Sequence, residues 1–234
     1  MNFSQRSYTK ELLDGEKIPR ADLYQNLKEL NTINKKLGGH AATIKGLRSI
    51  HLKKDRSYQI LDIGCGGGDT LKAIAKWGRD HGYQLELTGL DLKEDCINYA
   101  KKHCRKYREV HFIQSDYRHL KVMNQEYDII ITSLFCHHLS EKEITQLLGW
   151  AMMKARVGLI VNDLHRHPLA YYSIALLTGL FSKSYLVKND ARLSVLRGFK
   201  REELERLVPR SPFFRWKIMW CWAFRWLLII QPEK

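Results

Sequence analysis

The sequence predicts an α/β fold, with a mostly parallel sheet of seven strands that is covered by helices on both faces. Short β-rich runs alternate along the chain with segments of helical periodicity. Two runs, residues 127–133 and 157–163, have continuous apolar centres, which is typical of strands buried on both faces of a parallel sheet. The 234 residues, 44% hydrophobic and 27% charged, exclude a disordered chain, a collagen-like repeat and a coiled coil.

Residues 1–52 are predicted to form an N-terminal helical cap, and residues 53–234 the main domain. Apolar side chains between Ala21 and Leu37 recur with a period of about 3.6 residues, and Gly38-Gly39 ends that helix. A second short helix is expected from about residue 40 to residue 52.

Strands and helices alternate through the main domain. Strands are expected at residues 58–63, 85–90, 110–114, 127–133 and 157–163, and helices at residues 69–77, 94–106, 141–155 and 201–207. Residues 165–198 interrupt the alternation and are predicted to be a partly helical insertion on the substrate side. Two aromatic stretches, 213–220 and 222–230, predict an antiparallel hairpin, whose tryptophans are interpreted as core at the sheet edge rather than a stacking platform for bases.

A glycine loop follows the first strand, in the run Ile60-Leu61-Asp62-Ile63-Gly64-Cys65-Gly66-Gly67-Gly68-Asp69. Glycines there let the backbone approach a ligand and place the N–H groups of a helix start beside it. A dinucleotide site would have a third glycine where Asp69 stands, and a carboxylate beside a pyrophosphate is repulsive. The loop therefore disfavours an NAD-dependent oxidoreductase.

Acidic residues mark the carboxyl ends of the first three strands, where the ligand crevice of an open α/β sheet lies. Asp62 is suited to a cationic or amino-acid ligand. Asp91 can accept hydrogen bonds from both hydroxyls of a ribose, and Asp116 from an adenine amino group.

The motifs LDIGCGGG, LTGLDL, SDY and YDIIITSLFCHHL resemble those of the class I S-adenosylmethionine-dependent methyltransferases. The resemblance covers roughly residues 55–230 and includes the reversed hairpin of that Rossmann-like fold. It is nearest to the branch that contains methylases of ubiquinone and menaquinone synthesis and aromatic or polyketide O-methyltransferases.

The resemblance implies S-adenosylmethionine as cofactor and a set of residues that contact it. Those expected along the methionine moiety are Asp62, Gly64 and Gly66. Asp91 is expected at the ribose and Asp116 at the adenine. The backbone of Ser133 and Leu134 is expected beside the sulfonium, and the site is completed by Cys65, Leu92 and Tyr117.

Methyl transfer to a hydroxyl needs an aligned acceptor and a place for its proton, and histidine suits that task near neutral pH. The candidate bases are His138, after the fourth strand, and His165, after the fifth, where Asp163 can orient a ring. Alternatively, the His-His-Leu turn only precedes a helix that Ser140 caps, and the enzyme acts by positioning without a base.

No metal site is predicted, because the fourth strand ends in Thr132-Ser133-Leu134-Phe135 and offers no acidic pair. Cys136 is interpreted as a small buried hydrophobe rather than a nucleophile.

The helical cap and the insertion are expected to close over the cofactor and form an apolar acceptor pocket. The substrate-facing residues are predicted to be Arg166, Tyr171 and Tyr172. The alternative interpretation is that these aromatic residues pack the insertion onto the core and do not contact the substrate.

The chain carries 39 Lys and Arg against 25 Asp and Glu, a net charge of +14. The basic residues are spread over the whole chain, so we expect general surface charge and no specific nucleic-acid site. No apolar run reaches the length of a membrane span, and five scattered cysteines fit a reducing cytoplasm. The leading hypothesis is O-methylation of a small apolar or aromatic molecule; the alternatives are an RNA methyltransferase and a non-catalytic cofactor-binding subunit.

Overall fold

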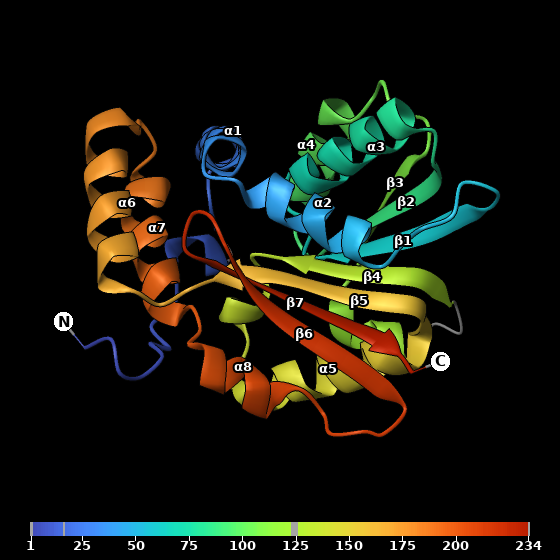
Figure 1. Ribbon diagram of the computed structural model, residues 1–234. Helices are drawn as coiled ribbons and strands as arrows, with labels where there is room; N and C mark the ends of the chain where they lie inside the picture. The colour runs from blue at the N-terminus through green and yellow to red at the C-terminus, as the bar shows by residue number, and fades with distance from the viewer. Residues whose placement is uncertain (1, 16, 123–125, 234) are drawn as a thin grey trace.

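Seven strands form one sheet in the order β3-β2-β1-β4-β5-β7-β6 in the computed structural model, which describes residues 2–15, 17–122 and 126–233 (Figure 1). Strands β1 to β5 run parallel, β7 runs antiparallel to β5, and β6 antiparallel to β7. The strands are β1 (Ser57–Ile63), β2 (Gln84–Asp91), β3 (Val110–Gln114), β4 (Tyr127–Ser133), β5 (Ala155–Leu164), β6 (Phe214–Cys221) and β7 (Arg225–Pro232). The predicted sheet with its antiparallel C-terminal hairpin is confirmed.

The strand order reverses between β1 and β4, which pair directly although β2 and β3 lie between them in the chain. Ile60 on β1 pairs with Ile129 on β4. A crevice outside the carboxyl ends of the strands at such a reversal is the usual ligand site of an open α/β sheet. The glycine loop after β1 and the histidine turn after β4 both lie at this crevice.

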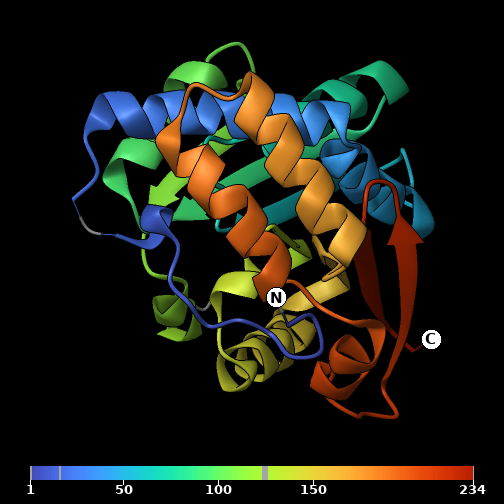
Figure 2. The same cartoon turned by 90° about the vertical axis from the view of Figure 1, so that its left-hand side faces the viewer.

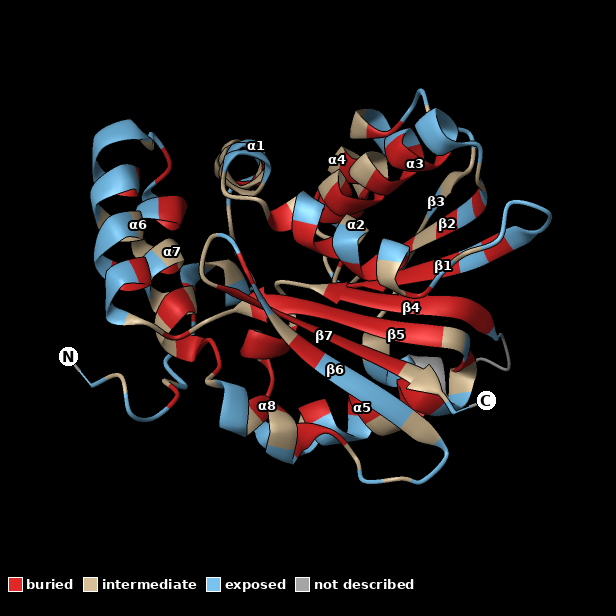
Figure 3. Cartoon of the chain, viewed as in Figure 1, coloured by how far each residue is buried: buried red, intermediate tan, exposed pale blue. Residues whose placement is uncertain are grey.

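Helices cover both faces of the sheet (Figure 1). One face carries α2 (Gly39–Ser49), α3 (Asp69–His81) and α4 (Glu94–His103), and the other carries α5 (Glu141–Lys154) and α8 (Arg201–Leu207). Leu71 and Ile74 belong to the core of the first face, and Leu148 and Leu204 to that of the second. Both cores are apolar and buried, which explains why β4 and β5 are apolar on both sides (Figure 3).

Three further helices lie beyond the carboxyl ends of the strands: α1 (Arg20–Lys36), α6 (Pro168–Phe181) and α7 (Tyr185–Arg197). α6 and α7 pack side by side, and α1 packs on α7 and α4 (Figure 2). The expected cap of residues 1–52 thus has two parts. α1 reaches the glycine loop, where Leu27 lies near Gly66, whereas α2 packs on β5 and β7, where Gly46 lets it approach Ile160 closely.

The N-terminal segment before α1 is tied down by long-range hydrogen bonds. Its short 3₁₀ helix η1 (Leu12–Asp14) follows Glu11, and the backbone N–H groups of Leu12 and Leu13 both donate to the Asp190 carboxylate, at 2.8 Å each. The Arg6 guanidinium donates to the carbonyl oxygen of His137 in η3 (Cys136–His138) and to that of Leu139. These contacts fix η1 against the turn that follows β4.

Some boundaries differ from the sequence prediction. The insertion at 165–198 consists of two complete helices, each started by a side-chain cap, His167 for α6 and Ser184 for α7. The helix expected at 94–106 already ends at His103. The capping box of Ser140 and Glu143 at the start of α5 is confirmed.

The tryptophan interpretation is right for one residue and wrong for three. Trp226 on β7 is buried, but Trp216, Trp220 and Trp222 are exposed. Trp216 and Trp220 lie on the edge strand β6, on either side of the buried Ile218, and Trp222 lies in the turn before β7 (Figure 3). Within the described residues, no helix is both long and apolar enough to cross a membrane.

Candidate functional site

The glycine loop turns sharply between β1 and α3. Gly64, Gly66 and Gly68 have φ angles of 73°, 51° and 74°, which favour glycine. A Cβ on Gly64 would lie 2.2 Å from the Phe135 ring, so the position also needs the missing side chain for space. The N–H groups of Gly64 and Cys65 donate to the Leu90 carbonyl oxygen at 2.8 and 3.0 Å, which ties the loop to the end of β2.

Two carboxylates flank this loop, and they differ in their hydrogen bonding. The Asp91 carboxylate accepts from the N–H groups of Gly66 and Lys93, at 2.9 Å each. Asp62 is buried, and its Oδ1 has no hydrogen-bond partner among the described residues. Burial and, second, the charge of Asp91 raise the pKa of Asp62 to about 8. A buried carboxylate oxygen without a partner beside a glycine loop suits a cationic group such as an amino group.

A crevice of about 260 Å³ opens beside the loop. It brings together five of the residues expected to bind the cofactor, namely Gly64, Asp91, Leu92, Asp116 and Tyr117. The Asp116 carboxylate is engaged by the Arg118 guanidinium, which lowers the pKa of Asp116. Arg118 is exposed, so an incoming ligand can compete for this carboxylate.

The turn after β4 has an unusual backbone. Leu134 has a φ of 55°, and its N–H donates to the Asn162 carbonyl oxygen at 2.9 Å. The Asn162 side chain donates to the Gly39 carbonyl oxygen at 2.8 Å and to the Thr43 hydroxyl at 2.9 Å. Asn162 therefore locks the ends of β4 and β5 to α2, a role that the sequence pattern did not reveal.

A second cavity of about 300 Å³ lies under α1, α6 and α7. Its lining is mostly apolar and includes Leu30, Ile33, Leu37, Ile174, Leu177, Val195 and Phe224. Its polar lining residues are Glu11, Asn26, Asn34, His137, His138, Ser173, Asp190, Ser194 and Arg225. Leu134 lines this cavity, and the next residue, Phe135, lines the crevice beside the glycine loop.

The predicted substrate residues do not line this cavity. Arg166 is buried, and its guanidinium donates to the carbonyl oxygens of Phe3, Ser4 and Gly198 and to the Glu203 carboxylate. Tyr171 packs on the Phe3 ring, with centroids 5.7 Å apart, and Tyr172 is exposed. The phase of α6 explains the difference: its Ala170, Ser173, Ile174 and Leu177 face the cavity instead.

His165 also lies outside both cavities. Its ring packs between His167 and Trp226, and its backbone bridges to Phe199. Burial, followed by the charges of His167 and Arg166, lowers the pKa of His165 to about 4. Asp163, which the sequence analysis placed beside His165, binds His137 instead.

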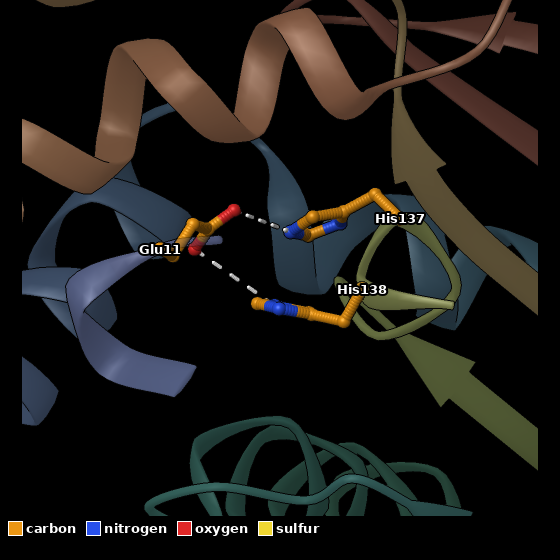
Figure 4. A group of neighbouring side chains, drawn as sticks. All are labelled: Glu11, His137 and His138. Carbon is orange, nitrogen blue, oxygen red and sulfur yellow. Dashed lines mark ion pairs between the residues drawn. The ribbon is translucent and has the colours of Figure 1, made fainter. Parts of the chain in front are cut away.

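His137, His138 and Glu11 form a polar cluster at the wall of the apolar cavity (Figure 4). His137 Nδ1 lies 2.7 Å from Asp163 Oδ1, and His138 Nδ1 lies 2.8 Å from Asp14 Oδ1. Because a carboxylate accepts hydrogen bonds, the Nδ1 atom of each ring is the donor in these contacts.

Both Nε2 atoms lie near the Glu11 carboxylate, at 3.6 Å for His137 and 3.9 Å for His138 (Figure 4). Glu11 is only 5% exposed, and the Ser194 hydroxyl donates to it at 2.8 Å. Burial raises the pKa of Glu11 to about 7. A proton on either Nε2 would be held beside the Glu11 carboxylate, so the cluster offers a place for a proton.

The sequence pointed to His138 but not to Glu11, which reaches the cluster from the polar N-terminal segment. No local pattern around Glu11 signals this role. The three ligand atoms lie within 4.8 Å of one another, and two imidazoles with one carboxylate are also a donor set that binds divalent ions. The prediction of no metal site rested on the residues at the end of β4, whereas Glu11 reaches this cluster from the N-terminal segment.

The comparisons with known proteins agree with this geometry. Residues 60–158 match a family described as a methyltransferase domain. The chain is 24% identical to the mitochondrial ubiquinone biosynthesis O-methyltransferase of Saccharomyces cerevisiae over 127 residues, 53% of this chain and 39% of that protein. It is 31% identical to the ubiquinone biosynthesis O-methyltransferase of Hydrogenovibrio crunogenus over 104 residues, 42% of this chain and 40% of that protein.

Each alignment thus spans less than half the length of the curated relative. Among solved structures, the plantazolicin methyltransferase BamL in complex with a triazolic desmethylPZN analog and SAH has a TM-score of 0.67 to this chain. The sequence identity is 15%, over 92% of this chain and 97% of that chain, so this likeness shows the fold.

Proposed function

We propose that this chain, which belongs to the class I S-adenosylmethionine-dependent methyltransferases, transfers the cofactor's methyl group to a hydroxyl group of a small, mostly apolar acceptor. One observation carries the proposal: Leu134 lines the apolar cavity and the adjacent Phe135 lines the crevice beside the glycine loop. Two ligands held in these cavities would therefore meet at the end of β4.

The residues around the glycine loop suit the cofactor. The unpartnered Asp62 oxygen matches its amino group, the Asp91 carboxylate its ribose hydroxyls and Asp116 its adenine amino group. When bound, S-adenosylmethionine supplies a methyl group already activated on a sulfonium. What remains for the protein is to align the acceptor, exclude water and receive a proton.

The cavity under α1, α6 and α7 suits the acceptor. Its aliphatic lining favours a flat apolar molecule such as a phenol, and its volume of about 300 Å³ is that of a small-molecule site. The curated relatives named above are O-methyltransferases, which supports a hydroxyl as the methylated group.

The cluster of Glu11, His137 and His138 would receive the hydroxyl proton. His138 is the candidate base retained from the sequence analysis, because it lines the cavity and Asp14 fixes its ring. The geometry does not favour His165 in this role, since it lies outside the cavity lining.

Calorimetry and a methyl-transfer assay test the proposal. S-adenosylhomocysteine should bind and NAD should not, and Asp91→Asn should weaken S-adenosylhomocysteine binding roughly 10- to 100-fold, while the exposed Asp80→Asn should not. With labelled cofactor and a panel of phenols, His138→Gln should lower kcat by roughly 10²–10⁴ and leave S-adenosylhomocysteine affinity unchanged. His165→Gln is the matched control. Tighter binding of NAD than of S-adenosylhomocysteine would refute the cofactor assignment.

A further inference from the structure

Within the part of the chain that the structure describes, Arg225 in the wall of the apolar cavity has no charged partner. Arg225 is the first residue of β7, and its backbone is fixed by pairing with Leu164 on β5 and Cys221 on β6. The residue is only 3% exposed, and it lines the cavity beside Leu37 and Phe224.

The hydrogen bonds of this guanidinium are incomplete. Nη2 donates to Asn34 Oδ1 at 2.8 Å, but Nε and Nη1 have no acceptor among the described residues. No carboxylate oxygen of the described residues lies within 4.0 Å of the Arg225 guanidinium. An unpaired buried charge is costly, and structures normally satisfy it with a counter-charge.

Asp163 acts on Arg225 through its charge, but the two side chains do not form an ion pair within 4.0 Å. The Asp163 oxygens are engaged by the ring and backbone N–H of His137 and by the N–H of Leu164. Burial lowers the pKa of Arg225 to about 10, so the guanidinium still carries its positive charge at neutral pH. The wall of the cavity therefore contains a positive charge, and two atoms of this guanidinium, Nε and Nη1, have no acceptor among the described residues.

We propose that Arg225 forms an anion subsite in the acceptor cavity and that the natural acceptor bears a carboxylate that pairs with this guanidinium. The inference rests on the proposed function only in naming the occupant of the cavity as the methyl acceptor. A carboxylate supplies the acceptor oxygens that Nε and Nη1 lack and neutralises the charge inside an apolar wall.

A second polar group in the same cavity supports a polar substituent on the occupant. Asn26 on α1 is buried and lines the cavity, and its Oδ1 has no donor among the described residues. An occupant that also carries a donor, such as a hydroxyl, would satisfy this oxygen. The unsatisfied atoms of Arg225 and Asn26 therefore favour an acceptor that carries both a carboxylate and a hydroxyl on an aromatic or apolar body.

The test compares two probes of the same shape, 2-naphthoate and the neutral 2-naphthamide, by calorimetry on the full chain with saturating S-adenosylhomocysteine. For the wild-type chain, we expect the carboxylate to bind roughly 10- to 100-fold more tightly than the amide. Arg225→Met should remove this preference, and Arg225→Lys should retain part of it. The control is Arg215→Met, since Arg215 is an exposed cation on the neighbouring strand β6, outside the cavity lining.

Equal affinity of the wild-type chain for the two probes would overturn the subsite, and this measurement does not depend on any variant folding. A preference for the carboxylate that survives in Arg225→Met would overturn it as well. Failure of the subsite alone leaves S-adenosylhomocysteine binding and methyl transfer intact. Failure of the proposed function appears instead as a loss of S-adenosylhomocysteine binding by the wild-type chain.

Discussion

Arg166 offers a direct test of structural against substrate-binding roles. In the structure it ties together three parts of the chain: its guanidinium donates to carbonyl oxygens at Phe3 and Ser4 of the N-terminal segment, to Gly198 after α7, and to Glu203 on α8. The arginine side chain is completely buried and that of Glu203 is 12% exposed. Arg166→Ala would remove the donor to Glu203 and to three carbonyl oxygens, of which that of Gly198 is buried and those of Phe3 and Ser4 are partly buried.

Removing one partner of a buried ion pair costs about 3–5 kcal/mol of unfolding free energy. For a domain of this size, each kcal/mol lowers Tm by about 2–4 °C, so Arg166→Ala should lower Tm by roughly 6–20 °C. Thermal unfolding followed by circular dichroism, at one protein concentration and without ligand, measures this shift. Arg201→Ala removes an exposed ion pair with Glu205 and should change Tm by no more than about 2 °C.

If Arg166 instead binds the substrate, Arg166→Ala should leave Tm unchanged and weaken acceptor binding. An unchanged Tm in Arg166→Ala, together with weaker binding of the acceptor, would show that this guanidinium serves the ligand and that the contacts described above are unimportant. A lowered Tm with an unchanged KM of the refolded variant supports the structural role.

Three further predictions concern the cofactor crevice and the surface charge. Gly64→Ala should lower the affinity for S-adenosylhomocysteine, measured by calorimetry, because the added Cβ would lie 2.2 Å from the Phe135 ring at a φ of 73°. The control is Gly179→Ala in α6, where nothing lies within 4 Å of the added Cβ; this variant should raise Tm slightly. S-adenosylhomocysteine affinity should rise between pH 6.5 and pH 8.5, since Asp62, with its pKa raised to about 8, must ionise to bind an amino group; this rise should disappear in Asp62→Asn. If the affinity of the wild-type chain is flat over this range, Asp62 does not hold the cofactor. Alanine substitution of Lys101, Lys102 and Arg105 should not change the methylation of a small acceptor, because these residues contribute only general surface charge. Methylation of bulk RNA that is lost in this variant would contradict the prediction.

The sequence by itself determined the sheet and the cofactor crevice. Strand and helix periods are local properties, and so are the glycine loop and the Ser140 capping box. Parallel strands joined by helices must place their carboxyl ends at one edge, so Asp91 and Asp116 necessarily meet at one crevice. For these features, spacing along the chain already fixes position in space.

The tertiary structure alone decided the acceptor side of the site. Which face of α6 lines the cavity depends on the N-terminal segment, whose Phe3 covers Tyr171 and whose backbone carbonyls engage Arg166. Glu11 joins His137 and His138 because long-range contacts, among them those of Asp190 on α7, hold the N-terminal segment in place. Such contacts join residues far apart in the sequence, and their geometry is set by packing and buried polar pairing, which leave no periodic trace in the sequence.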